Sequence, residues 1–371
     1  MYVLQVFFIG GILLVLFRRE SLILHFQIII WAVAVSFLFM YFGFDGQLNF
    51  YSNDQSFYVS VLHDVPSKMT WEDLDYWLTS AKVPYTGPAF LLYQAGLHEA
   101  LALKTVSLLF LIGFTRRILR STESTHISAE LRCAYLTGCG AVGVFFSTLC
   151  LRETAMMYFV YRYATDPTGA FRILMLTGVY LLRPHLAAAL LAAEAISIVW
   201  DRVKLWKKTS HLHIITLLVI GSVIGTNLLY WGLVGFSGLR SPWDSDLGIK
   251  YLTRFASNFV GLHFLTARDS TLEMTIGDLL YARLLFSESL VIPILFSLSI
   301  VLGFHRTSSF HRRTLLSLAI FTTISAGTDY LSFRQNLPLF GLLGVSTIQL
   351  TSQSRSLRSS NADKLQFNAT L

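Results

Sequence analysis

The sequence is poor in charge and in cysteine, and it lacks the fingerprints of soluble nucleotide-using enzymes. Only 14% of its 371 residues are charged, against about 25% in a soluble domain, which argues against an ordinary soluble fold. Its three cysteines (Cys133, Cys139 and Cys150) share one apolar stretch without a CxxC spacing, so we expect small buried side chains rather than a disulfide or metal site. The chain has no P-loop, no dinucleotide-binding GxGxxG after a strand and no GxSxG elbow, so ATP-driven transport is unsupported.

Long apolar runs are what the chain has in abundance. Hydrophobic residues make up 54% of it and the mean hydropathy is +0.56, and short charged segments separate the runs. A membrane-crossing helix needs about 20 apolar residues, so we predict an all-α polytopic transmembrane helical bundle of about 11 spans. The candidate spans are 1–17, 22–44, 89–115, 130–150, 152–165, 168–183, 186–201, 213–236, 288–305, 314–329 and 335–351. The first run lacks a preceding basic region and a cleavage site, and we interpret it as a retained span.

The segments that connect successive spans lie on alternating sides of the membrane. Basic residues are concentrated in the segments of one side. The connecting segments of that side contain Arg18, Arg19, Arg116, Arg117, Arg120, Arg202, Lys204, Lys207, Lys208, Arg306, Arg312, Arg313, Arg355 and Arg358. The positive-inside rule puts this side in the cytoplasm, with the N-terminus outside and the C-terminus inside. The net charge of +7 is then a topology signal, and no nucleic-acid partner is expected. We predict one transmembrane domain over 1–351, outer-face loops at about 45–88 and 237–287, and a flexible cytoplasmic tail over 352–371.

Two predicted spans, 152–165 and 168–183, are short for a bilayer. At about 1.5 Å per residue, a 14-residue helix reaches only ~21 Å. These segments are therefore either broken or tilted helices, or a re-entrant pair that enters from outside. Both alternatives leave Arg152 and Arg183 near the outer face, because two crossings or none preserve the sidedness of the later segments.

An acidic residue follows the second span. Asp54 lies in the polar segment 51–58, where a carboxylate facing a cleft can act as a general base on a sugar hydroxyl. Tyr58 comes four residues later, so a helix would put both side chains on one face. A plain helix cap beside an interfacial tyrosine is the simpler alternative.

Two further polar motifs interrupt apolar sequence in mid-chain. Arg152 and Glu153 directly follow an apolar span; the planar guanidinium fits two phosphate oxygens, and Glu153 can orient it or act as a base. Arg183-Pro184-His185 stands between two later spans, and Pro184 ends or bends the helix there. His185 can donate to a phosphate or relay a proton. A snorkelling arginine and an ordinary turn are the respective alternatives.

The remaining candidates are weaker. Arg334 and Gln335 stand between the last two spans, and Arg240 and Arg254 lie in the second outer loop as further possible phosphate contacts. The outer-side histidines have no HExxH spacing, so neither a zinc site nor another cofactor is expected.

Together these motifs resemble the bacterial cell-envelope polysaccharide polymerases and polytopic glycosyltransferases of the Wzy- and EpsG-like group. The resemblance rests on Asp54 with Tyr58, on Arg152 with Glu153, on Arg183-Pro184-His185 and on the large outer loop in the C-terminal half. It covers most of the chain as layout and about a dozen residues as motif.

The resemblance implies a multi-pass protein of the bacterial cytoplasmic membrane that polymerises or transfers glycan units carried on polyprenyl pyrophosphate, in O-antigen, capsule or exopolysaccharide synthesis. Arginines would bind the pyrophosphate while a carboxylate or His185 helps the acceptor hydroxyl attack. The implied partners are the lipid-linked glycan, membrane lipid and other envelope-glycan assembly proteins. A transporter or flippase of lipid-linked oligosaccharide and a non-catalytic assembly partner remain as alternatives; convergence of the arginines on one outward cavity favours the enzyme.

Overall fold

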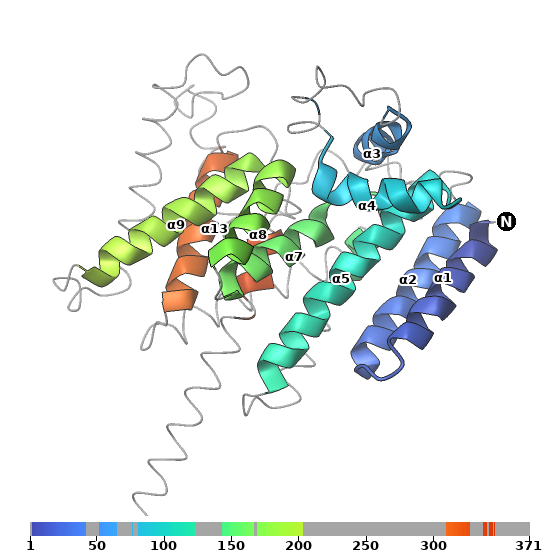
Figure 1. Cartoon of the computed structure of the whole chain (residues 1–371), viewed down its shortest axis with the longest axis horizontal. Coiled ribbons are helices and arrows are strands. Elements are labelled where there is room, and N and C mark those ends of the chain that lie inside the picture. The colour runs from blue at the N-terminus through green and yellow to red at the C-terminus, as the bar shows by residue number, and fades with distance from the viewer. Residues whose placement is uncertain are drawn as a thin grey trace, which may run out of the picture. The chain divides into compact units, whose positions relative to one another are not determined.

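Most of the described part of the chain is helical. A computed structural model describes residues 2–41, 52–64, 76, 81–123, 143–166, 169–202, 309–326, 337–339, 341–343 and 345. Within these ranges the regular elements are helices and none is a strand, which confirms the all-α class (Figure 1). The helices with defined bounds are α1 Tyr2–Leu16, α2 Leu22–Tyr41, α3 Ser52–Asp64, α4 Val83–Gln94, α5 Glu99–Glu123, α7 Glu153–Thr165, α8 Gly169–Leu182, α9 Pro184–Arg202 and α13 Ser309–Ala326.

Part of the predicted layout lies outside the described residues. The predicted spans 213–236 and 288–305, the second outer loop 237–287 and the tail 352–371 fall there. The first outer loop is described in part, through α3 and the beginning of α4.

The chain divides into two compact units. The first comprises Met1–Arg117, Leu136–Ala187 and Asp269–Glu288, and the second comprises Ile118–Tyr135, Ala188–Arg268 and Ser289–Leu371. The first unit therefore holds α1 to α4, most of α5, α7 and α8. The single transmembrane domain predicted over 1–351 stays a prediction.

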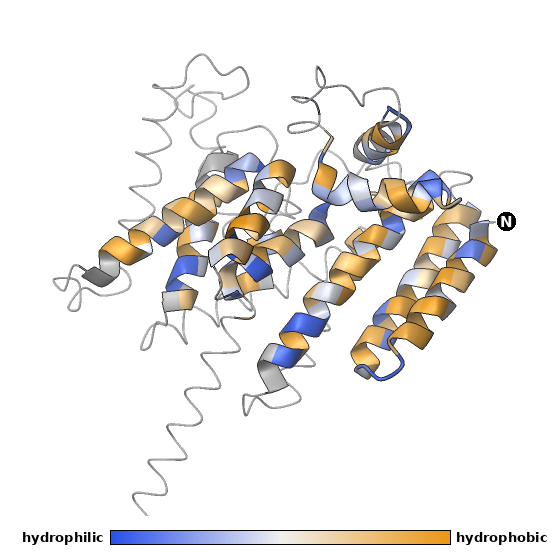
Figure 2. Cartoon of the chain, viewed as in Figure 1, coloured by the Kyte–Doolittle hydropathy of each residue, from blue (hydrophilic) through white to orange (hydrophobic). Residues whose placement is uncertain are grey.

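Helices α1 and α2 form an antiparallel hairpin in the first unit (Figure 1). A Cβ added at Gly10 would lie 3.3 Å from Ala32 Cβ, so the two backbones approach closely there. Figure 2 shows both helices largely hydrophobic, with hydrophilic colour at the turn that joins them. The exposed large side chains of the hairpin are Leu4, Phe7, Phe8, Ile12, Val15, Leu16, Leu22, Phe26, Ile29, Ile30, Val33, Phe37, Met40 and Tyr41. The hairpin thus presents an apolar surface outward.

Helix α2 is, among the described residues, the one helix with the length and composition to cross a bilayer. Three shorter apolar helices accompany it: α1, α8 and Pro184–Val199 of α9. The remaining spans of the predicted set, and their number, stay a prediction.

The predicted span 89–115 is not one helix, and this expectation was wrong. Helix α4 ends at Gln94 and α5 begins at Glu99. Gly96 has a φ of +96°, a left-handed conformation that glycine adopts without steric cost and that commonly ends helices. Three backbone N–H groups of the turn donate back to the last carbonyls of α4: Ala95 to Leu91, Gly96 to Tyr93 and Leu97 to Leu92. The apolar run conceals this break, because the turn residues are themselves mostly apolar.

The predicted break at Pro184 is confirmed. Helix α8 ends at Leu182 and α9 begins at Pro184, where the missing proline N–H costs no helical hydrogen bond. Helices α7 and α8 pack closely: a Cβ at Gly178 would come within 2.8 Å of the Phe159 ring. Arg162, in the last turn of α7, also contacts the beginning of α8. Its Nε lies 2.6 Å from Asp166 Oδ2, and its guanidinium lies 4.4 Å from the centre of the Phe171 ring.

In the second unit, α13 contacts the later part of α9. Arg313 Nη1 lies 3.8 Å from Glu194 Oε1, and Arg312 Nη2 donates to Ser197 Oγ at 3.4 Å. Both arginines belong to the basic set that the sequence assigns to the cytoplasmic face.

Candidate functional site

The site is built on a break in the backbone just before α7. Residues 143–151 are all buried, and the chain leaves helical conformation after Ser147 and resumes it at Glu153. Buried backbone carbonyls outside a helix need partners from elsewhere in the protein. Three side chains of α2 and α5 supply them: Trp31 Nε1 donates to Ser147 O at 3.0 Å, Lys104 Nζ to Thr148 O at 2.5 Å, and Ser107 Oγ to Leu151 O at 3.1 Å.

A side chain of α3 also contacts the backbone at this break. The backbone N–H of Cys150 donates to Gln55 Oε1 at 3.5 Å, and the Cys150 thiol contacts Ala100 O at 3.6 Å. Cys150 is fully buried, as expected for it. Side chains from three helices therefore fix the position of Arg152, the next charged residue along the chain.

Arg152 and Glu153 open α7. Arg152 occupies the N-cap position without a side-chain cap hydrogen bond, and its carbonyl accepts from Met156 N at 3.0 Å. Helix N-caps favour Ser, Thr, Asp or Asn, and a cation there opposes the positive end of the helix dipole. Glu153 follows in the first turn and is only 1% exposed. Local helix stability does not explain an arginine at this position.

Lys82 opens α4 in a similar way. It is the N-cap residue, again without a side-chain cap, and Pro84 lies in the first turn. Within the described ranges it is the one non-glycine residue with a positive φ, at 54°, a conformation that costs an L-residue roughly 1 kcal/mol or more. Its carbonyl accepts from Tyr85 N at 2.9 Å and from Thr86 N at 3.1 Å, which holds the strained turn in place.

Arg183 and His185 flank the proline that opens α9. Arg183 is 7% exposed; its N–H donates to Val179 O at 2.7 Å, and its carbonyl accepts from Leu186 N at 3.1 Å. It is therefore held between the last turn of α8 and the first turn of α9. His185 lies in that first turn, with part of its side chain exposed and part covered by the protein.

Lys82 lies close enough to Arg152, Arg183 and His185 for its charge to interact with theirs, and Arg183 likewise acts on His185. Burial, then the charge of Arg152, then that of Arg183, lower the pKa of Lys82 to about 8. Burial, then Arg183, then Lys82, hold the pKa of His185 below its usual value, so His185 is largely neutral at neutral pH. The N-terminal ends of α4, α7 and α9 meet here, and each adds positive potential. We call Lys82, Arg152, Arg183 and His185 the cationic cluster.

Known proteins give no template for this arrangement. No protein-family model, curated protein or solved structure matches the chain. The chemistry of the site has to be argued from its own residues.

Tyr85 lies in the first turn of α4 and contacts Ser107, one of the side chains that hold the break before α7. Its hydroxyl donates to Leu103 O at 3.3 Å and lies 3.1 Å from Ser107 Oγ, and Ser107 Oγ in turn donates to Leu151 O. The Tyr58 ring meets the Tyr85 ring edge-on, with centres 5.4 Å apart. Burial raises the pKa of Tyr85 well above its usual value, with smaller contributions from Cys150, Tyr58 and Glu153, so the phenol keeps its proton.

The structure brings together several residues singled out from the sequence. Arg152, Arg183 and His185 join one cluster, and Tyr58 and Glu153 both lie beside Tyr85. The backbone of Asp54 lies in helix α3, together with that of Tyr58. The side chain of Asp54 is outside the described residues. The other four candidates, Arg240, Arg254, Arg334 and Gln335, also lie outside them.

Sequence reasoning missed Lys82 and Tyr85. Both fall in the segment interpreted as a long outer loop, which hid the beginning of α4. A usable signal was present: Lys82 precedes Pro84 by two residues, much as Arg183 precedes Pro184 by one. In both places, a cationic residue stands just before a proline in the first turn of a helix.

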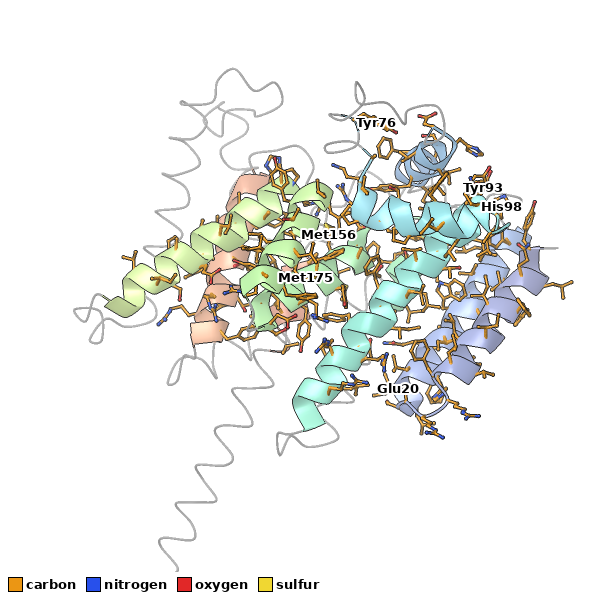
Figure 3. All side chains as sticks on the ribbon, viewed as in Figure 1. Glu20, Tyr76, Tyr93, His98, Met156 and Met175 are labelled. Carbon is orange, nitrogen blue, oxygen red and sulfur yellow. The ribbon has the colours of Figure 1, made fainter. Side chains whose placement is uncertain are left out.

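A second polar group lies at the beginning of α5. Glu99 accepts from two imidazoles, with His63 Nε2 2.9 Å from Oε1 and His98 Nε2 3.3 Å from Oε2. Figure 3 shows His98 and Tyr93 together at this end of the first unit, and Glu20 at the opposite end of the hairpin. In the part of the chain that is described, no group of three His, Cys, Asp or Glu side chains is placed to hold a metal ion. Glu99 ties α3 to α5.

Proposed function

We propose that this protein transfers or polymerises glycan units carried on polyprenyl pyrophosphate at the outer face of a bacterial cytoplasmic membrane. The observation that carries the proposal is the cationic cluster at the meeting point of three helix N-termini. Guanidinium groups bind phosphate oxygens in pairs, and helix N-termini bind phosphate through free N–H groups. A diphosphate is therefore the ligand that fits best.

The surface of the first unit supports a membrane location. The α1–α2 hairpin exposes Phe8 by 70% and Phe26 by 61%, large apolar side chains that a lipid environment would cover. At one end of the hairpin, the exposed Arg18 and Arg19 accompany an ion pair between Arg116 and Glu20. By the positive-inside rule this end faces the cytoplasm.

The depth of the cluster supports the outer face. Ser107, which contacts the break before α7, lies nine residues before Arg116 on α5, a rise of about 14 Å. The cluster therefore belongs to the half of the unit away from the arginine-rich end. In the proposed topology the whole chain has about 11 spans, and its N-terminus lies outside.

The proposed reaction assigns roles to the cluster. An acceptor hydroxyl attacks the anomeric carbon, the bond from that carbon to the diphosphate oxygen breaks, and the diphosphate leaves with the electron pair. Arg152 and Arg183, already oriented by the folded backbone, stabilise the negative charge that develops on the leaving group. The hydroxyl proton passes to a general base. His185, largely neutral before substrate binds, and the carboxylates of Asp54 and Glu153 are the candidates.

The test is complementation of a deletion strain with Arg183→Ala, scored by glycan chain length on a gel against a membrane-abundance blot. We expect normal abundance, loss of polymer and accumulation of single repeat units, because the leaving diphosphate loses a charge partner. Arg19→Ala is the matched control, since Arg19 is an exposed arginine at the opposite end of the unit.

Two outcomes would contradict the proposal. Normal polymer length with Arg183→Ala would remove Arg183 from substrate binding. Accumulation of the lipid-linked unit at the inner leaflet, measured by its accessibility to an added glycosidase, would favour a flippase.

A further inference from the structure

One end of the α1–α2 hairpin gathers arginines from two parts of the first unit. Arg18 and Arg19 lie in the turn that joins the two helices, and both are exposed. Arg116 of α5 reaches the same turn, where its Nη2 pairs with Glu20 Oε1 and its guanidinium lies 5.3 Å from the centre of the Phe17 ring. Figure 2 shows hydrophilic colour on this turn and on α5 toward its C-terminal end. The ion pair therefore brings positive charge from α5 to the turn of the hairpin.

Positive charge is in excess at this place. Arg117 follows Arg116 on α5 and is exposed as well, and we call Arg18, Arg19, Arg116 and Arg117 the arginine end. In residues 15–26 and 109–117 the one acidic residue is Glu20, and it is already paired with Arg116. The arginine end therefore carries an excess of three positive charges, with three of its four side chains exposed.

The turn that carries two of these arginines has a defined backbone. The N–H of Glu20 donates to Phe17 O at 2.9 Å, across the two arginines. Ser21 Oγ accepts from the N–H of Ile23 at 3.1 Å and so caps the beginning of α2. The arginine side chains therefore leave the backbone from fixed points, which lowers the entropy lost when a ligand binds them.

Large apolar side chains flank the arginine end. Leu16 is 68% exposed just before the turn and Leu22 is 75% exposed just after it, and Val15 and Phe26 continue this apolar surface on α1 and α2. Helix α2 has the length and composition to cross a bilayer, so its first turn lies where hydrocarbon meets water. Exposed arginines beside an outward apolar surface match the two parts of a phospholipid, the phosphate and the acyl chains.

We propose that the arginine end binds the headgroup of an anionic phospholipid in the cytoplasmic leaflet, with the acyl chains along the outward face of the hairpin. Guanidinium groups bind phosphate oxygens in pairs, and basic residues beside a membrane are attracted to anionic lipid. A zwitterionic phospholipid has no net charge and should bind more weakly. A free anion would leave the exposed apolar flank without a role. This inference uses the membrane location of the proposed function and not its glycan chemistry.

The experiment is photolabelling of the full-length protein in phosphatidylcholine vesicles. The probes are a phosphatidylglycerol and a phosphatidylcholine with the same diazirine-bearing acyl chain, each added at low mole fraction. Peptide mass spectrometry measures the label that each probe leaves on residues 15–26. We expect roughly tenfold more label from the anionic probe, competed by unlabelled phosphatidylglycerol and not by inorganic phosphate. Added salt should reduce the preference, because exposed charges are screened.

Three variants define the result. Arg18→Gln with Arg19→Gln should be labelled about equally by the two probes, whereas Arg18→Lys with Arg19→Lys keeps the charge and should keep most of the preference. Glu20→Gln removes the opposing charge and should increase the preference for the anionic probe. The thermal midpoint of each variant checks that it is folded. Arg19→Ala alone leaves three of the four arginines, so it stays a suitable control for polymer synthesis.

Failure of this inference is distinguishable from failure of the proposed function. Equal labelling of the wild type by both probes would overturn the headgroup site and leave the proposed glycan chemistry standing. Displacement of the anionic probe by inorganic phosphate would assign the arginine end to a free anion instead. Wild-type protein that an alkaline wash removes from the vesicles would overturn the membrane location, on which both proposals depend.

Discussion

The α1–α2 hairpin and the break before α7 belong to the same unit but are stabilised in opposite ways. The hairpin turns large apolar side chains outward along its length and is joined by a polar turn. The break is a short piece of buried non-helical backbone whose carbonyls accept from Trp31, Lys104 and Ser107. An outward apolar side chain contributes little to folding stability in a lipid or detergent surround, whereas a buried carbonyl that loses its donor costs about 1–3 kcal/mol. Tolerance to substitution should therefore differ sharply between the two regions.

Trp31 and Phe26 give the largest expected contrast, because both are aromatic residues of α2. Trp31 is fully buried and donates to Ser147 O, while Phe26 is 61% exposed. Trp31→Ala should lower the free energy of unfolding by about 3–5 kcal/mol through cavity formation and an orphaned carbonyl. Phe26→Ala should stay within about 0.5 kcal/mol. Denaturant titration of the protein in mixed micelles measures both.

Equal losses for the two variants would contradict the assignment of the outward face of α2 to lipid. Trp31→Phe separates the two contributions to the larger effect. It keeps most of the ring volume and removes the N–H donor, so it should retain about 1–3 kcal/mol of the destabilisation.

Glycine substitutions give the next contrast, between the α7–α8 pair and the hairpin. A Cβ at Gly178 would come within 2.8 Å of the Phe159 ring, whereas a Cβ at Gly11 meets nothing within 4 Å. Gly178→Ala should cost about 1–3 kcal/mol through overpacking. Gly11→Ala should gain up to about 1 kcal/mol from helix propensity. Thermal unfolding in one detergent compares them, and a stabilising Gly178→Ala would mean that Phe159 moves freely.

The pH dependence of stability gives the smallest contrast. The folded pKa of Lys82 is about 8, below its usual value of 10.5, so the unfolded chain binds more protons between these values. Stability should therefore rise with pH from about 8 to 10 and be lost as the pH falls through that window. Solvent screening of this half-buried group limits the rise to on the order of 1 kcal/mol. Unfolding of the wild type and of Lys82→Met at several pH values should show a flatter profile for the variant.

The contrast between the two regions also explains what the sequence could and could not predict. The all-α class follows from apolar runs, and the break at Pro184 follows from proline chemistry, so both are local properties. The break at Gly96 was missed because it lies inside an apolar window. Lys82 was missed because the lysine before Pro84, the one local signal that α4 begins there, lies in a segment interpreted as a loop.

The supports of the site are non-local, and no sequence pattern reports them. Trp31 and Ser147 are 116 residues apart, and Gln55 and Cys150 are 95 apart. A tryptophan within an apolar run looks the same whether its N–H meets a carbonyl or the membrane interface. Arg152 and Glu153 could be singled out as unusual, but the helices that hold them could not be named.

The direction of the long-range hydrogen bonds bears on how the protein is made. Each side chain that fastens the break, from α2, α3 and α5, precedes it in the chain, and Lys104 is separated from Thr148 by 44 residues. A chain synthesised from its N-terminus has all of these partners at hand when the break is translated. The hydrogen bonds that hold the break can therefore form as residues 147–152 leave the ribosome, before the later residues of the first unit are synthesised.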